Sequence, residues 1–570
     1  MTAFDLVIRG GTVVDGTGGA PYVADVAIAK GSIAAVGTGL PAGREEIDAT
    51  GKLVTPGFVD IHTHYDGQVT WDNRLAPSSF HGITTAVIGN CGVGFAPCRT
   101  DDATREALAR LMEGVEDIPH PVLMEGLPWT WETFPEYLDF LASRPYDMDI
   151  LAYVPHAPLR VYVMGERGAN REPATPEDIA EMCRLLGEAL DKGAAGIATS
   201  RSLFHRSSDG KPIPTFEVSQ LELLALAGVL REKGKGVFQI VEDLNLPGAN
   251  LNAMRELAAA SGRPLTFSIG TANAAPYEYP HLLEELAEAN RQGLDLKAQL
   301  IPRGIGMILG FEMALNPFYT TATYRSLAGL PLKERLKRLR EPEIRSAIIA
   351  EPVDPDPASA LGRAVRQFEY MFVLGDEPDY EQPPERSIAG RARAAGVTPE
   401  EIAYDILIEG DSGGKLYLAM ANYSDGKLDA VGEILSHPDV VLGLGDGGAH
   451  LGTICDASYS TFALAYWARD RQTGRKTVED MVHRMTQATA RVMGLTDRGL
   501  IRAGLRADIN IIDFDKLALK APEVVYDLPS GDRRLLQRAD GYEVTMVGGE
   551  IVYRNGEPTG VLPGGLVRAA

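Results

Sequence analysis

The sequence contains few cysteines, no surplus of positive charge and no long apolar run. Four cysteines among 570 residues are too few for a disulfide framework, and no two are spaced as C-x-x-C. A functional cysteine is therefore expected to act as a thiol or a metal ligand. No apolar stretch approaches the roughly 18 residues that span a bilayer, and the N-terminus lacks the basic and apolar segments of a signal peptide. We expect a cytoplasmic protein without membrane attachment.

The charge balance and the missing motifs exclude further classes. Acidic residues outnumber basic ones by 78 to 55, which gives a formal net charge of −23. This charge repels nucleic-acid phosphates and anionic lipid headgroups. The sequence also lacks a phosphate-binding P-loop, a G-x-S-x-G serine motif and a dinucleotide-binding fingerprint. A small-molecule substrate and assembly into a homo-oligomer are the expectations that remain.

Short β-rich segments with glycine turns occupy both ends of the chain. Residues 1–56 and 500–570 each contain several strand-like runs, and neither end is large enough to form a stable core alone. We therefore predict that the two ends pair into one small β-sandwich.

Apolar strands alternate with amphipathic helices between these ends. This pattern is typical of a parallel sheet, and seven to eight such strands favour an α/β fold of the (β/α)8 TIM-barrel type over residues 57–499. Residues near 95–150 and 303–405 interrupt the alternation with proline-rich, charged and aromatic sequence. We interpret them as insertions that cover the active face of the barrel, with a solvated linker as the alternative.

Two histidines stand two positions apart at the end of an apolar strand. Side chains at such spacing point to the same side, so His62 and His64 can bind one metal ion. Asp446 follows another apolar strand, and we predict that it binds the metal and also accepts a proton from the attacking water. A capping role at the next helix is the structural alternative for this aspartate.

These motifs together resemble the amidohydrolase superfamily. Residues 55–64 read TPGFVDIHTH, and residues 89–92, GNCG, resemble the D-aminoacylase or N-acyl-D-amino-acid deacylase branch. Residues 499–508, GLIRAGLRAD, match the segment that leads such proteins back into their β domain. The resemblance implies a (β/α)8 barrel, hydrolysis of an amide bond, zinc, and a thiolate ligand at Cys91.

The sequence departs from this family at two expected metal ligands. Relatives with a full metal centre carry a histidine at the end of the fifth strand and another at the end of the sixth. The corresponding segments here, GVFQIVED and LTFSIG, contain none. We therefore favour one zinc ion over two, held by His62, His64, Cys91 and Asp446. Asp243 and His205 are the candidate substitutes for the missing ligands.

The substrate is less constrained than the metal site. The acyl-D-amino-acid branch binds the substrate carboxylate with basic residues, but residues 447–462 and 270–273 contain no lysine or arginine. An unpaired carboxylate in a dry pocket costs several kcal/mol. A neutral amide, carbamate, lactone or cyclic ureide is therefore an alternative substrate. A catalytically silent binding protein is the alternative outside enzymes, because two ligands are missing.

Several further polar residues at the ends of apolar runs are candidates for substrate binding. His156 follows the third run, Arg201 and His205 follow the fourth, and His450 lies four residues after the predicted catalytic aspartate. Tyr423 ends another apolar run. Each of these side chains has packing or loop stabilisation as its alternative role.

Overall fold

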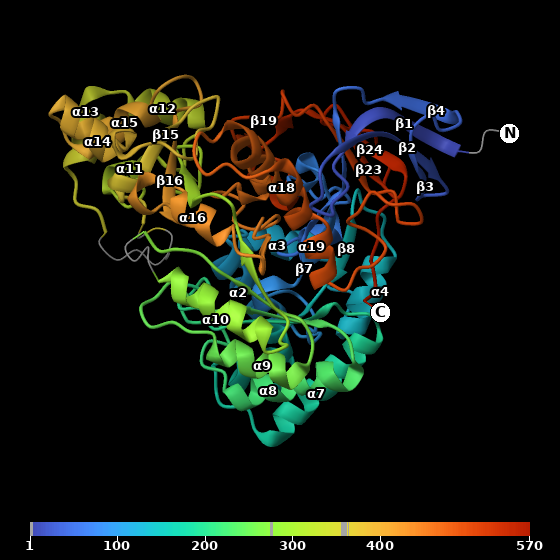
Figure 1. Cartoon of the computed structure of the whole chain (residues 1–570). Helices are drawn as coiled ribbons and strands as arrows, with labels where there is room; N and C mark the ends of the chain where they lie inside the picture. Colours follow the sequence, from blue (N-terminus) through green and yellow to red (C-terminus); the bar gives the residue numbers. More distant parts are fainter. Residues whose placement is uncertain (1–3, 274–277, 355–361, 363, 570) are drawn as a thin grey trace.

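The chain folds into three parts (Figure 1). The computed structural model describes residues 4–273, 278–354, 362 and 364–569. Strands from both ends form a β domain, the middle of the chain forms a barrel, and a third part with its own core is inserted before the last barrel strand. No helix within the described residues is both long and apolar enough to cross a bilayer.

The barrel is built from eight parallel strand positions. Two parallel sheets, β6-β7-β8 and β9-β10-β11-β12-β13-β17, share a strand that is interrupted between β8 and β9. These strands have a near-continuous apolar sequence because both of their faces are buried. The (β/α)8 prediction is confirmed. The strands are β6 (Phe58–Asp60), β7 (Ile83–Ile88), β8 (Asp149–Ala152), β9 (Val154–Pro155), β10 (Gly196–Ser200), β11 (Val237–Val241), β12 (Leu265–Ser268), β13 (Leu296–Leu300) and β17 (Val440–Leu442).

One barrel strand, β13, has no clear signal in the sequence. Its residues read LKAQL, so two polar side chains interrupt the apolar run. Lys297 forms an ion pair with Asp439 at a distance of 2.6 Å. Gln299 is fully buried and forms a hydrogen bond with His62. Each polar residue thus has a structural partner that the local pattern cannot reveal.

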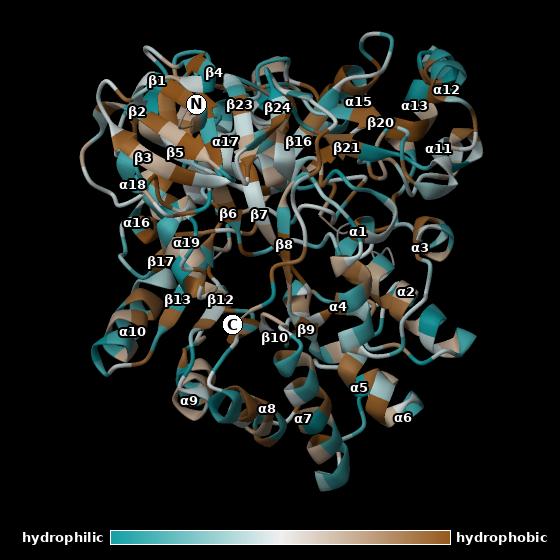
Figure 2. Cartoon of the chain, turned by 90° about the vertical axis from the view of Figure 1, so that its right-hand side faces the viewer, coloured by the Kyte–Doolittle hydropathy of each residue, from teal (hydrophilic) through white to brown (hydrophobic). Residues whose placement is uncertain are grey.

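Amphipathic helices surround the barrel strands (Figure 2). Helix α7 begins after Thr175, whose side chain accepts a hydrogen bond from the Asp178 backbone in a capping box. Its apolar face, which includes Met182 and Leu186, is buried in the main core. The neighbouring helices bury similar faces. They are α7 (Pro176–Asp191), α8 (Gln220–Lys233), α9 (Asn252–Ser261) and α10 (Tyr279–Arg291).

The two ends of the chain meet in one nine-stranded sheet, the β-sandwich domain. Strand β5 pairs with β18 in antiparallel register, with Val54 opposite Ile511. Apolar residues from both ends form a shared core. Beyond β25 the chain leaves this domain, and Leu566 pairs with Ile150 of the barrel. The strands are β1 (Phe4–Val13), β2 (Tyr22–Ala29), β3 (Ser32–Gly37), β4 (Gly43–Asp48), β5 (Leu53–Pro56), β18 (Ile509–Ile512), β23 (Tyr542–Val547), β24 (Glu550–Arg554) and β25 (Glu557–Pro558).

The insertion near residues 303–405 forms a small α/β unit. A three-stranded antiparallel sheet packs with helices α11 to α15 around a second hydrophobic core. The apolar run before Tyr423 is a strand of this inserted sheet rather than of the barrel. The elements are β14 (Ile305–Leu309), α11 (Ala322–Leu327), α12 (Leu332–Leu339), α13 (Pro342–Ala350), β15 (Met371–Leu374), α14 (Ile388–Ala395), α15 (Pro399–Leu407) and β16 (Lys415–Ala421).

The insertion near residues 95–150 is helical and packs on the barrel. Its longest helix, α2, buries an apolar face in the main core. The end of α2 makes a backbone hydrogen bond to the loop that follows β17. This insertion therefore reaches the carboxyl face of the barrel. Its helices are α2 (Asp102–Glu116), α3 (His120–Gly126) and α4 (Phe134–Ala142).

Candidate metal centre

His62 and His64 lie directly beyond the carboxyl end of β6, between the second and last barrel strands. The backbone N–H of His64 donates to Gly447 at 2.8 Å, and that of Asp446 donates to His62 at 3.2 Å. These bonds connect the first and last strands at the barrel mouth. Both imidazoles are almost completely buried, with ring centroids 5.4 Å apart.

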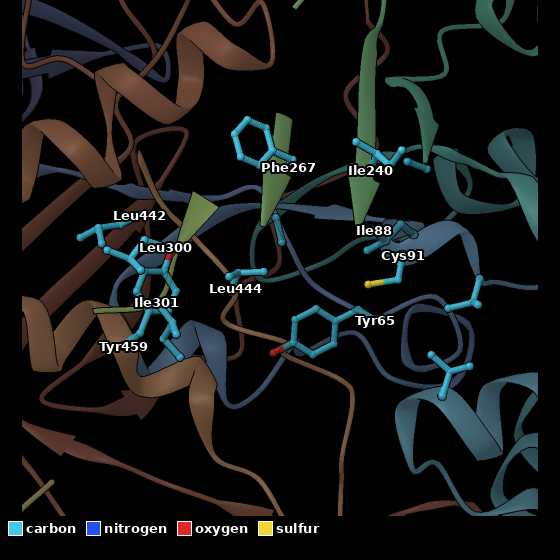
Figure 3. Close-up of a cluster of buried hydrophobic side chains, with 14 of the residues drawn as sticks. Tyr65, Ile88, Cys91, Ile240, Phe267, Leu300, Ile301, Leu442, Leu444 and Tyr459 are labelled. Atoms are coloured by element: carbon cyan, nitrogen blue, oxygen red, sulfur yellow. The ribbon is translucent and has the colours of Figure 1, made fainter. Parts of the chain in front are cut away.

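Cys91 completes a group of three donor atoms. It lies in a tight turn after β7 with a left-handed backbone (φ 57°), a conformation that costs about 1 kcal/mol outside glycine. Its backbone N–H donates to Gln239 Oε1 at 3.2 Å, which helps to hold this turn. The thiol sulfur lies 3.3 Å from His62 Nε2 and 3.8 Å from His64 Nε2. Figure 3 shows Cys91 among the apolar side chains that surround the site.

Asp446 lies against the two imidazoles on a strained loop. Its carboxylate oxygen Oδ1 is 3.7 Å from Nε2 of both His62 and His64. Leu444, Asp446 and His450 all have positive φ angles, of 62°, 46° and 49°. Such backbone strain is found where the surrounding structure fixes a functional geometry.

The donor atoms of three of these residues, His62, His64 and Cys91, all lie within 4.8 Å of one another. Tetrahedral zinc with ordinary Zn–N and Zn–S bonds places its donor atoms about 3.5 Å apart. The sulfur–nitrogen separations of 3.3 and 3.8 Å are close to that value. Asp446 lies beside the two imidazoles but outside this group of three.

A glutamine fixes the orientation of His62. Its Nδ1 lies 2.8 Å from Gln299 Oε1, and the amide nitrogen of Gln299 donates to Thr266 Oγ1 at 2.9 Å. The amide oxygen therefore accepts the proton on Nδ1, which leaves the lone pair of Nε2 facing the other donors. Gln299 thus fixes the tautomer and the orientation of His62 from behind the ring.

His64 faces a carboxylate instead. Its Nδ1 lies 3.4 Å from Oε1 of Glu116, the last residue of α2. The other oxygen of this carboxylate lies 3.9 Å from His450 Nε2. Glu116 is buried, and burial raises the pKa of its carboxyl well above the ordinary value. Sequence analysis missed this residue because it lies in an insertion.

Burial keeps the metal-free site close to neutral. It lowers the pKa of His62 to about 4 and the pKa of His64 well below its ordinary value. It also raises the pKa values of the Cys91 thiol and the Asp446 carboxyl well above their ordinary ranges. A divalent cation can displace the two acidic protons, because metal ligands bind in their deprotonated forms.

His205 and His450 lie near this group but outside its closely spaced donors. His205 follows β10, and its Nδ1 is 2.8 Å from Ser200 Oγ. Its charge would lower the pKa values of His62, His64 and His450, which places it beside the centre. Burial lowers the pKa values of both His205 and His450 to about 4.

The structure gives His156 and Tyr423 other partners than a substrate. Both ring nitrogens of His156 are engaged, one with Thr199 and the other with Glu222, each at 2.9 Å. The Tyr423 hydroxyl donates to the backbone of Gln382 within the inserted unit. These contacts are of the kind expected for the alternative role of both residues, which is packing or loop stabilisation.

Two further predicted residues brace loops at the barrel mouth. Arg201 Nε donates to Glu242 Oε1 at 2.7 Å. Asp243 accepts hydrogen bonds from Ser202 Oγ at 2.6 Å and from the Leu203 backbone at 2.8 Å. Arg201, Glu242 and Asp243 line a surface cavity of about 540 Å³ whose lining does not include the four metal-site residues.

Two glutamines are the polar groups that sequence analysis overlooked on the opposite strands. Gln239 lies on β11 and Gln299 on β13, and both are fully buried. A single polar residue inside an otherwise apolar strand is a usable sequence signal, because a buried polar group requires a hydrogen-bond partner. Glu116 offers no comparable signal, since its contacts depend on how α2 packs.

Known proteins resemble this chain over nearly its whole length. An N-acyl-D-aspartate deacylase of Alcaligenes xylosoxydans xylosoxydans is 28% identical, over 99% of this chain and 95% of its own. A D-aminoacylase of the same organism is 26% identical, over 98% and 96%. An uncharacterized protein of Mycobacterium tuberculosis is 28% identical, over 97% and 92%.

Solved structures share the fold. A D-aminoacylase with a binuclear metal center has a TM-score of 0.65 and 24% identity, over 99% of both chains. An N-acyl-D-glutamate deacylase from Bordetella bronchiseptica, complexed with zinc and a phosphonate inhibitor, has a TM-score of 0.63 and 24% identity, over 99% of this chain and all of the other. Both likenesses establish the barrel with its β-sandwich.

The match to a protein family decides the assignment. A model of the amidohydrolase family matches residues 45–553, which include the barrel, both insertions and part of the β-sandwich domain. This membership favours an enzyme over a silent binding protein. The chain belongs to the amidohydrolase family and is a hydrolase that acts on C–N bonds.

Proposed function

We propose that this protein is a zinc-dependent hydrolase that cleaves an amide bond of the N-acyl amino acid type. The observation that carries the proposal is the grouping of His62, His64 and Cys91 donor atoms within 4.8 Å, with Asp446 Oδ1 3.7 Å from both imidazoles. The zinc-bound deacylase and the D-amino-acid deacylases among the relatives support this choice of reaction.

One zinc ion is favoured over two. A thiolate and two imidazoles form a donor set that suits zinc, whereas magnesium and calcium prefer oxygen ligands. The strands opposite this set offer Gln239 and Gln299, whose amides form hydrogen bonds to Cys91 and His62. Neutral amides in these roles support the first ion and do not provide a second strong site.

Asp446 carries the proton transfers in this proposal. A zinc ion held by His62, His64 and Cys91 would lower the pKa of a water and polarise the scissile carbonyl. The Asp446 carboxylate would accept a proton from the attacking water and return it to the leaving nitrogen. His450 and His205 form hydrogen bonds to the substrate in this proposal.

A neutral substrate is a second candidate, favoured by the pairing of two arginines at the ends of barrel strands. Arg201, after β10, is paired with Glu242. Arg303, after β13, is buried and paired with Asp456 at 2.6 Å. Neither guanidinium is free to balance a substrate carboxylate, which would be costly to bury alone.

The reaction can be tested with matched substrates. Release of free amine would be measured from N-acyl amino acids of both configurations and from their carboxamides. Zinc-dependent hydrolysis that a chelator stops and added zinc restores is the expected result. Preference for the carboxamides would select the neutral candidate, and hydrolysis indifferent to the chelator would reject the zinc mechanism.

Two expectations stay predictions, one on the location of the protein in the cell and one on its oligomeric state. We propose that the protein is cytoplasmic and forms a homo-oligomer. Light scattering of the purified chain would give the mass in solution, and a value near 61.4 kDa would contradict the oligomer.

A further inference from the structure

The end of helix α2 brings an insertion into direct contact with the metal centre. We propose that Glu116 is a positioning residue: its carboxylate holds His64 and His450 together and orients His64 toward the metal. This inference rests on the proposed function. It assigns a role in the metal centre to the insertion near residues 95–150, which is outside the barrel strands.

The contacts of Glu116 join a metal ligand to a substrate-facing histidine. Oε1 lies 3.4 Å from His64 Nδ1, and Oε2 lies 3.9 Å from His450 Nε2. Neither His64 Nδ1 nor Glu116 Oε1 has a hydrogen-bond partner among the described residues, and both are buried. Each atom therefore has the other as its available partner, and a small approach would form a hydrogen bond.

A carboxylate beside His64 Nδ1 can orient the ring. A carboxylate that accepts the proton on Nδ1 fixes the tautomer, so that Nε2 presents its lone pair to the metal, and it also makes the ring a stronger ligand. His62 receives the neutral amide of Gln299 for the same task. The two histidines thus face different partners, an amide oxygen at 2.8 Å from His62 and a carboxylate oxygen at 3.4 Å from His64.

The packing of α2 holds this carboxylate in place. The Glu116 carbonyl accepts the backbone N–H of His450, and Thr453 Oγ1 donates to Asp117 at 3.0 Å. On the other side, a Cβ added to Gly114 would lie 2.2 Å from the backbone carbon of Ser207. The end of α2 is therefore packed closely between the loop that carries His450 and the loop that follows His205.

The test is the zinc affinity of the whole chain, measured by competition with a chromophoric chelator. We expect Glu116→Gln to bind zinc about 10- to 100-fold more weakly, because it keeps the shape of the side chain and removes the charge. A role in packing alone would leave Glu116→Gln like the unaltered protein and weaken only Glu116→Ala. Glu113→Gln is the matched control on the same helix, since its carboxylate accepts from the His120 backbone.

The outcomes separate this inference from the proposed function. Zinc binding by Glu116→Gln within about twofold of the unaltered protein overturns the inference alone. An unaltered chain that binds no zinc overturns the proposed function and the inference together. If Glu116→Gln does not fold, a crystal structure of the zinc-loaded unaltered chain decides: a Glu116–His64 Nδ1 distance within about 3.2 Å is expected, and separation of the two groups contradicts it.

Discussion

The two sides of the barrel mouth differ in the chemistry of their inward-facing residues. The side formed by β6, β7 and β17 carries two imidazoles, a thiol and a carboxylate, all of which can bind a metal. The side formed by β11, β12 and β13 carries Gln239, Thr266 and Gln299, which are fully buried and uncharged. The metal-binding groups lie on the segments that follow the strands, whereas the two glutamines lie within strands.

We call the side with Gln239 and Gln299 the amide side and the side with the metal-binding groups the donor side. The amide side supports the donor side through hydrogen bonds. Gln299 accepts the proton of His62 Nδ1, and Gln239 accepts the backbone N–H of Cys91. The two glutamines thus hold His62 and the turn at Cys91 in place.

The largest expected effect comes from removing the proton acceptor on the donor side. Asp446→Asn should lower kcat by about 10²- to 10⁴-fold, the usual contribution of a positioned general base. Steady-state hydrolysis and zinc content would be measured on the same preparation. Near-normal turnover at full zinc occupancy would exclude Asp446 as the base.

Loss of a ligand from the donor side should affect zinc binding next. Cys91→Ala should weaken zinc affinity by more than the 10- to 100-fold that loss of an outer-sphere partner causes. Cys98→Ala is the matched control, because that thiol is also buried and contacts the Arg99 backbone instead. Chelator competition would be used for both, and equal affinities for the two variants would count against thiolate ligation.

A smaller effect is expected on the amide side. Gln299→Leu removes the partner of His62 Nδ1 and should weaken zinc binding by about tenfold, at the low end for an outer-sphere support. Thermal unfolding of the metal-free chain would control for lost packing. If zinc affinity is unchanged while the variant is folded, the glutamine does not orient the ligand.

Much of the fold follows from local patterns in the sequence. Apolar runs alternating with amphipathic helices predict the barrel, and the β-rich ends predict the shared sandwich. Strand β13 escaped detection because Lys297 and Gln299 break its apolar pattern, and their partners lie far along the chain. The run before Tyr423 resembles a barrel strand, but it pairs within the inserted sheet.

The candidate site also contains residues that local sequence patterns predict and a residue that they do not predict. His62, His64, Cys91 and Asp446 follow strands, and the ends of parallel strands meet at one face of a barrel. Their proximity could therefore be predicted from the sequence alone. The proximity of Glu116 could not be predicted, because this residue reaches the centre through the packing of an inserted helix. Long-range packing leaves no periodic signal in the sequence.

The most direct measurement is the metal content of protein purified without a chelator, by elemental analysis. We expect close to one zinc per chain, because one side of the barrel mouth offers strong ligands and the other offers amides. Absence of metal would contradict the zinc centre, and two tightly bound ions would contradict the supporting role of the glutamines.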